Sequence, residues 1–144
     1  MKKNFSIITG LLIGLSIMLS SCSKEQVFLA NLHGTWNLDS YLQNDGTTPN
    51  VIPGVTFVTQ VTFFDCSTKN TQQNCNAVQT TTTTAVVGNT TTVDINSSEG
   101  SYQVEDKSLL TFRGDIWAVD KIDKKNLIIH KVEHPSAVYT YTKN

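Results

Sequence analysis

The amino-acid sequence predicts an all-β domain, an antiparallel up-and-down meander closing into a barrel of about eight or nine strands. Three observations support this fold class. From residue 34 onward, β-branched and aromatic residues alternate with polar residues, a period that is typical of strands with one buried face. Turn-forming residues separate the alternating segments at short intervals. A meander of this length usually avoids exposed strand edges by closing on itself.

The elements follow from this pattern in chain order. Residues 26–32 predict one short helical turn, with Val27, Phe28 and Leu32 on one side. No long helical pattern appears elsewhere in the part expected to fold. The alternation then predicts strands at residues 35–42, 56–66, 76–87, 90–96, 101–105, 109–113, 116–122, 127–132 and 138–142.

The turns between these strands are marked by small and polar residues. Threonine runs at 80–84 and 90–92 flank Gly88-Asn89, which is a tight hairpin signal. Threonine is β-branched and favours strands, so the two runs are expected to face each other rather than to be disordered. Further turns are expected at residues 97–100 and at Gly114-Asp115.

The N-terminus has the pattern of an export signal. Two lysines precede an apolar segment at residues 7–19, which ends in Leu19-Ser20-Ser21-Cys22. The segment is too short for a stable transmembrane anchor and has the shape of a secretory signal. Its last four residues resemble the lipobox of bacterial lipoproteins, in which the cysteine is lipidated and becomes the first mature residue. The alternative is an ordinary cleaved signal with a chance cysteine, although the usual Ala-x-Ala pattern is missing.

This resemblance implies a domain organisation and a location. Residues 1–21 would be a signal peptide, residues 22–31 a lipidated N-terminus and tether, and residues 32–144 the barrel domain. The protein would be held in the bacterial cell envelope through the lipid on Cys22. Ser23 lacks the acidic character that resembles an inner-membrane retention signal, so we expect the outer membrane, on its periplasmic or surface face.

Charge and cysteine content narrow the possible functions. Removal of residues 1–21 leaves nine basic and twelve acidic residues, and this balance argues against nucleic-acid binding. Cys66 and Cys75 remain, separated by eight mostly polar residues that read as a hairpin loop. In an exported protein they are expected to form a disulfide. A metal site would need further ligands, and a catalytic thiol would need a basic partner.

Both ends of the predicted barrel resemble lipocalin-like domains of small bacterial lipoproteins. Gly34-Thr35-Trp36 matches the Gly-x-Trp that opens the first strand in that family, and residues 120–129 with the strand Tyr139-Thr140-Tyr141-Thr142 look similar to the closing part. The resemblance covers residues 32–142. It implies an eight-stranded barrel whose closed end is covered by Trp36.

Two features depart from that family. Lipocalins proper carry a late arginine that packs over the tryptophan, whereas the single arginine here, Arg113, lies in an earlier strand. Arg113 is expected either to lie at a turn or to reach the tryptophan from another direction. The chain is also shorter than a typical ligand carrier, so a barrel filled by its own side chains is an alternative to a ligand cavity.

No catalytic or metal-binding arrangement stands out. His130 and His134 are four residues apart, a spacing that brings ligands together on a helix but not on a strand. The serines lack a Gly-x-Ser-x-Gly elbow, and no phosphate-binding glycine loop is present. We therefore expect no enzyme, no cofactor and no metal.

Aromatic residues are the remaining candidates for a site. They are expected either to form the core or to line a barrel mouth that binds a small apolar molecule. Which face of the last strand points inward is open, because either tyrosine or threonine would fit. The leading function is binding or carriage of a small apolar ligand, and the alternative is a structural or protein-interaction module of the envelope. The candidate residues are Trp36, Phe57, Phe63, Tyr102, Phe112, Trp117, Tyr139 and Tyr141.

Overall fold

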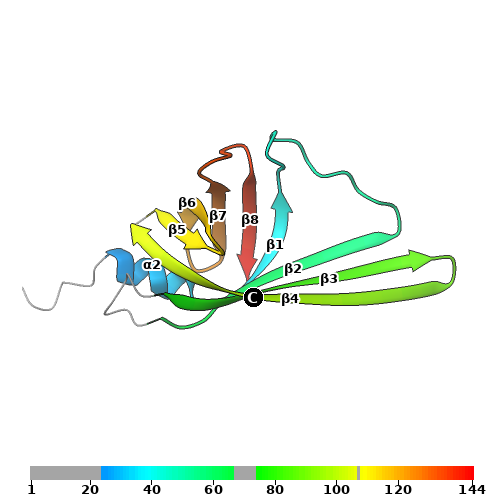
Figure 1. The fold of residues 1–144 in the computed structure, drawn as a ribbon, viewed down its shortest axis with the longest axis horizontal. Coiled ribbons are helices and arrows are strands. Elements are labelled where there is room, and N and C mark those ends of the chain that lie inside the picture. Colours follow the sequence, from blue (N-terminus) through cyan, green and yellow to red (C-terminus); the bar gives the residue numbers. More distant parts are fainter. Residues whose placement is uncertain (1–23, 67–73, 107) are drawn as a thin grey trace, which may run out of the picture.

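Eight strands form one closed antiparallel barrel, and each strand pairs with the next one along the chain (Figure 1). The computed structural model describes residues 24–66, 74–106 and 108–144. The strands follow sequence order and β8 returns to pair with β1, so the predicted all-β meander barrel is confirmed. The elements are α2 (Lys24–Leu32), β1 (Gly34–Tyr41), β2 (Val55–Phe63), β3 (Cys75–Val87), β4 (Thr90–Asp106), β5 (Leu109–Phe112), β6 (Asp115–Ile122), β7 (Asn126–Lys131) and β8 (Val138–Lys143).

The predicted turn at residues 97–100 is wrong, because β4 continues through it without interruption. Ser97 lies opposite Thr80 on β3, and this pairing continues without a break to Gly100. The local turn signal is therefore overridden by a complete partner strand, and the barrel has eight strands instead of nine. Glycine at position 100 leaves room for the Arg113 side chain, because a Cβ built there would lie 2.9 Å from the Cγ of Arg113.

The helix α2 packs its apolar face on the barrel and occupies most of the segment expected to be a tether. Phe28, Leu29 and Leu32 are buried, whereas Val27 is half exposed. The predicted apolar side is therefore wrong at Val27, because the 3.6-residue period places residues 28, 29 and 32 on one face. The helix contacts β4 and β6. In the described part of the chain, no helix is long and apolar enough to cross a membrane.

Trp36 lies fully buried at the closed end of the barrel, as predicted. Its indole Nε1–H donates to the backbone oxygen of Leu32 at 2.7 Å. The Nζ of Lys143, at the end of β8, lies 5.0 Å from the centre of the Trp36 ring and donates to the backbone oxygen of Asn31 at 2.8 Å. Lys143 therefore makes a cation–π contact with Trp36, whereas Arg113 lies in the β5–β6 turn, one of the two positions expected for it.

A disulfide joins Cys66 and Cys75 at the same end, which confirms the predicted bridge. Cys75 lies opposite Tyr102 on β4, and the Tyr102 hydroxyl donates to the backbone oxygen of Phe64 at 2.7 Å. The disulfide and this hydrogen bond both fix the chain that leaves β2. Of the residues between Cys66 and Cys75, those at 67–73 lie outside the described part of the chain.

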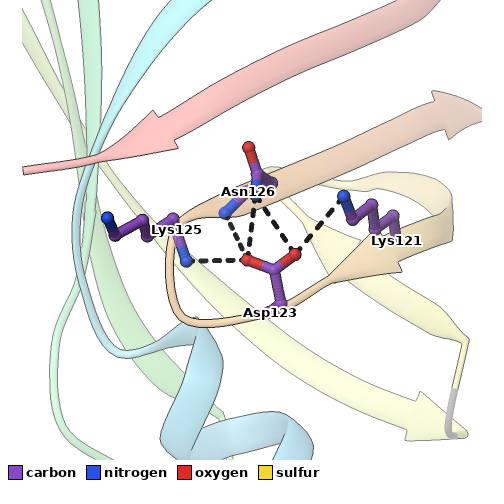
Figure 2. Close-up of polar contacts among 4 residues, drawn as sticks. All are labelled: Lys121, Asp123, Lys125 and Asn126. Atoms are coloured by element: carbon purple, nitrogen blue, oxygen red, sulfur yellow. Dashed lines mark hydrogen bonds and ion pairs between the residues drawn. The ribbon is translucent and has the colours of Figure 1, made fainter.

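The turn between β6 and β7 is held by one carboxylate (Figure 2). Asp123 accepts hydrogen bonds from the backbone N–H groups of Lys125 and Asn126, both at 2.8 Å, and Lys121 lies 3.4 Å from its second oxygen. The N–H of Lys125, followed by that of Asn126, holds the pKa of Asp123 well below its ordinary value. An aspartate that accepts hydrogen bonds from the backbone two and three residues further on is a common way to fix such a turn.

Three strands continue well beyond the barrel and project to one side in Figure 1. Pairing of β1 with β2 stops at Asn37↔Gln60, and pairing of β5 with β4 stops at Tyr102↔Phe112. We define the extension as residues 55–59 of β2, 81–87 of β3 and 90–96 of β4, where the β1 edge of β2 and the β5 edge of β4 have no strand partner among the described residues.

Candidate functional site

A cavity of about 710 Å³ opens at the end of the barrel opposite Trp36 and α2. Its buried floor is aromatic and aliphatic, because alternate residues of neighbouring strands point inward. Phe112 lies at the end of β5, Trp117 on β6, Ile129 on β7 and Tyr141 on β8, and each is less than a tenth exposed. The rim is open to solvent and includes Phe57 of β2, which is 58% exposed.

The β1–β2 loop forms part of the cavity wall. Its residues 49–52 line the cavity, and Val51 and Ile52 in this stretch are exposed. The loop ends at the tip of the extension, where the N–H of Val86 donates to the backbone oxygen of Gly54 at 2.7 Å. The chain from β1 therefore passes beside the cavity mouth before it enters β2. Figure 1 shows the course of this loop from the end of β1 to the start of β2.

The three charged side chains of the cavity and one amide form what we call the polar side: Gln79, Arg113, Asp115 and Lys131. Arg113 Nη1 donates to Gln79 Oε1 at 3.0 Å, and Lys131 Nζ donates to Asp115 Oδ2 at 2.8 Å. Lys131 lies directly opposite Trp117 in the β6–β7 register, and its Nζ is 5.2 Å from the centre of the Trp117 ring. The polar side thus consists of two hydrogen-bonded pairs, Gln79 with Arg113 and Asp115 with Lys131.

Aromatic rings support the other side of the mouth. Tyr139 stacks on Tyr41 with ring centres 5.6 Å apart, and the edge-to-face pair of Tyr139 and Trp117 has centres 5.1 Å apart. Tyr141 lies deeper, where burial raises the pKa of its hydroxyl above the ordinary value, with a smaller contribution from Tyr139. Because both Tyr139 and Tyr141 line the cavity, the inward face of the last strand is the tyrosine face.

The predicted candidate residues divide into two groups. Trp36, Phe63 and Tyr102 lie in the core at the closed end and do not line the cavity. Burial raises the pKa of Tyr102 to about 12, with a smaller effect of Asp65. The residues that line the cavity are Phe57, Phe112, Trp117, Tyr139 and Tyr141.

Sequence reasoning missed the polar side of the cavity. Lys131 continues the inward face of Leu127 and Ile129 by the two-residue period, and that signal was available. The turn lies at Arg113-Gly114, one residue before the expected Gly114-Asp115, and alternation alone does not place a turn at the open end of a barrel.

The histidines do not form a metal site. His130 Nδ1 lies 2.8 Å from Asp120 Oδ2, while His33 and His134 are exposed. Among the residues that the structure describes, no group of three or more histidine, cysteine or acidic side chains is arranged to hold a metal ion. Cys22, the predicted lipidation site, lies outside the described residues.

Compared with known protein families, with characterised proteins and with solved structures, the chain matches none.

Proposed function

We propose that this chain is a lipid-anchored envelope protein that binds a small, mostly apolar molecule in the open end of its barrel. The cavity is the observation that supports this function. Its volume of about 710 Å³ lies within the range of ordinary small-molecule sites, and an apolar floor with a few polar groups is typical of them. A barrel filled by its own side chains would not leave such a space.

Binding fits the polar side better than catalysis does. The polar side chains pair with each other, Arg113 with Gln79 and Lys131 with Asp115. Neither pair places a hydroxyl or thiol nucleophile next to a base, the arrangement used by enzymes that form an acyl intermediate on serine or cysteine. We therefore assign the cavity a role in holding a molecule and not in changing it.

The anchoring part of the proposal rests on Leu19-Ser20-Ser21-Cys22. A protein with several acyl chains on one cysteine stays in a membrane because each buried methylene contributes about 0.8 kcal/mol. Cys22→Ala should therefore release the protein from the membrane fraction or block its maturation. Unchanged fractionation together with an unchanged intact mass would contradict lipidation.

Filling the cavity tests the binding function directly. Thr81 lines the cavity, whereas its neighbour Thr82 points to the other face of β3. Thr81→Phe should abolish saturable binding of a fluorescent fatty-acid analogue, and the matched control Thr82→Phe should leave the binding unchanged. Equal binding by both variants, or no saturable binding to the unmodified protein by any of several apolar probes, would contradict the proposed function.

A protein-interaction module is the second candidate, and the extension favours it. Val58 and Ile95 both lie opposite Thr82, so they share one face, and Val86 and Val93 belong to the same face by register and alternation. These four side chains are 48–66% exposed. An exposed apolar patch on an otherwise polar sheet is typical of an interaction surface.

A further inference from the structure

Arg113 has an uncommon backbone conformation at the mouth of the cavity. Its φ is 55°, and it is the one non-glycine residue with positive φ in the described part of the chain. Together with Gly114, at φ 84°, it forms the left-handed turn between β5 and β6. Asparagine, aspartate and glycine are the residues that favour this position. An arginine here lacks a local structural reason, and such outliers are concentrated where a side chain serves a function.

A second adaptation accommodates the same side chain. A Cβ on Gly100 of β4 would lie 2.9 Å from the Cγ of Arg113, so any larger residue at this position would force the Arg113 side chain to move. Gly100 lies within an otherwise regular strand, where glycine weakens the strand by itself and often marks a close approach. The turn and the strand beside it thus both accommodate Arg113 at the cavity rim.

Among the residues that the structure describes, the charge of Arg113 has no acidic partner. Lys131 is neutralised by Asp115 at 2.8 Å, whereas the contact of Arg113 is the uncharged amide oxygen of Gln79 at 3.0 Å. None of the ion pairs found among the described residues includes Arg113. The polar side therefore carries one excess positive charge, and a guanidinium has five donors in a planar fork that fits a carboxylate.

The floor below the polar side also contains an unused donor. The indole Nε1–H of Trp117 is buried and has no hydrogen-bond partner within the described residues. A buried donor without an acceptor is unfavourable. Both Arg113 and Trp117 thus favour a ligand with an acceptor group at this side of the cavity.

We propose that the cavity selects a molecule with a single carboxylate on an apolar body, and that Arg113 binds the carboxylate at the mouth. This inference rests on the proposed binding function and adds the class of ligand. The apolar body would lie against Phe112, Trp117 and Ile129, which are buried and apolar. One excess positive charge matches a ligand with one negative charge. A carboxylate bound at the open rim also stays in contact with water, which avoids the cost of moving it into the apolar floor.

Dodecanoate, dodecanol and dodecyl trimethylammonium have the same alkyl chain and differ in their head groups. Comparing their affinities therefore tests which head group the cavity prefers. Trp36 and Trp117 are the two tryptophans of the chain, so fluorescence of a Trp36→Phe variant reports on Trp117 in the cavity wall. Dodecanoate is expected to bind about tenfold or more tightly than dodecanol, since a hydrogen-bonded charge contributes that much. The ammonium compound should bind most weakly, and added salt should weaken dodecanoate alone.

Substitution of Arg113 then separates its charge from its structural role. Arg113→Asn should weaken dodecanoate binding about tenfold and change dodecanol binding less than about twofold. Because asparagine tolerates positive φ, the same variant should fold with an unfolding midpoint that is unchanged or raised by about 1–4 °C. Lys124→Gln, at the turn of the closed end, removes one positive charge far from the cavity and should leave both affinities unchanged.

The outcomes distinguish the two proposals. If dodecanoate and dodecanol bind equally well, or if Arg113→Asn weakens both alike, the carboxylate assignment is wrong while the cavity still binds apolar molecules. If none of the three compounds gives saturable binding, the proposed function and this inference both fail. If Lys124→Gln weakens dodecanoate binding as much as Arg113→Asn does, the effect comes from net charge in general, and the role of Arg113 is wrong.

Discussion

Strands β2, β3 and β4 contribute both to the closed end of the barrel and to the extension, but the two regions differ in what holds them together. At the closed end, β2, β3 and β4 bury Phe63, Ala77 and Tyr102 against Trp36. In the extension the same strands pair in unbroken register, although Val87 is 78% exposed and Phe57 is 58% exposed. Strand pairing therefore extends much further than the core does.

This difference shows how β-branched residues support a sheet without burial. Threonines fill β3 from 80 to 84, and their hydroxyls contact neighbours across the sheet: Thr59 lies 3.2 Å from Thr81, and Thr80 lies 3.1 Å from Ser97. Such cross-strand pairs contribute only a few tenths of a kcal/mol to about 1 kcal/mol each. We infer that the closed end supplies most of the stability and that the extension is a dependent part of the sheet.

The largest contrast is expected for matched aromatic truncations. Trp36→Ala removes a fully buried ring that contacts Lys143 and Leu32, and it should lower the free energy of unfolding by about 3–5 kcal/mol. Phe57→Ala, in the extension, should lower it by less than about 1 kcal/mol. Denaturant titrations followed by circular dichroism measure both values. Similar losses for the two variants would contradict the division between the regions.

The disulfide provides the next largest effect. Replacing Cys66 and Cys75 together by alanine should lower the free energy of unfolding by about 2–3 kcal/mol, because the bridge closes a short loop at the stable end. Intact mass after alkylation, with and without reductant, checks the bond itself. Two thiols that react freely in newly purified protein without reductant would show that the bridge is not formed.

Tyr102 gives the closed end a pH dependence that the extension should lack. Burial raises the pKa of Tyr102 to about 12 from an ordinary value of 10.0. The folded state then retains a proton that the unfolded state loses, so this contribution to stability is present below pH 10 and is lost as the pH rises through 12. Tyr102→Phe should lower stability at neutral pH by about 1 kcal/mol, since the hydrogen bond to Phe64 is lost.

The dependence of the free energy of unfolding on pH tests this assignment. Free energies of unfolding at several values between about pH 9 and about pH 11 should fall more steeply for the unmodified protein than for Tyr102→Phe. Part of the slope will remain, because burial also raises the pKa of Tyr141. Parallel pH profiles for the two proteins would show that Tyr102 ionises normally.

The smallest effect is expected on the outer face of the extension. Val93→Thr and Ile95→Thr keep β-branched residues in β4 and remove exposed apolar groups. Each should change the free energy of unfolding by less than about 0.5 kcal/mol. A loss above about 1 kcal/mol from either one, measured in dilute monomeric protein, would mean that this face is covered and that the contrast with the closed end is overstated.

Local sequence patterns predicted the strands well because alternation and turn residues act over short distances. The boundaries of β1 and β8 lie within one residue of their predicted positions. The failure at residues 97–100 has a different origin: serine, glutamate and glycine favour a turn, but a complete partner on β3 holds them extended. The partners of these positions lie 17 to 23 residues away along the chain, so no local pattern reveals them.

The candidate site was predictable only in its apolar part. Aromatic residues such as Trp117 and Tyr139 stood out by composition, yet nothing local separated them from Trp36 or Tyr102 at the other end of the barrel. The end of the barrel to which a residue belongs follows from register and strand direction together. The charge at Arg113 gains its meaning only when the turn is placed at the open end and Gly100 of β4 beside it.

The pairing of β1 with β8 indicates the order in which parts of the barrel form. Every other pairing of the barrel joins strands that are neighbours along the chain, whereas the side chains of Asn37 and Asn144 meet across a separation of 107 residues. Local hairpins form in microseconds. Contacts between distant residues form later, because other interactions must first offset the loss of chain entropy that they require. A chain still being synthesised would thus carry a curved, unclosed sheet from β1 to β7. Closure, and with it the cover of Lys143 over Trp36, would come last.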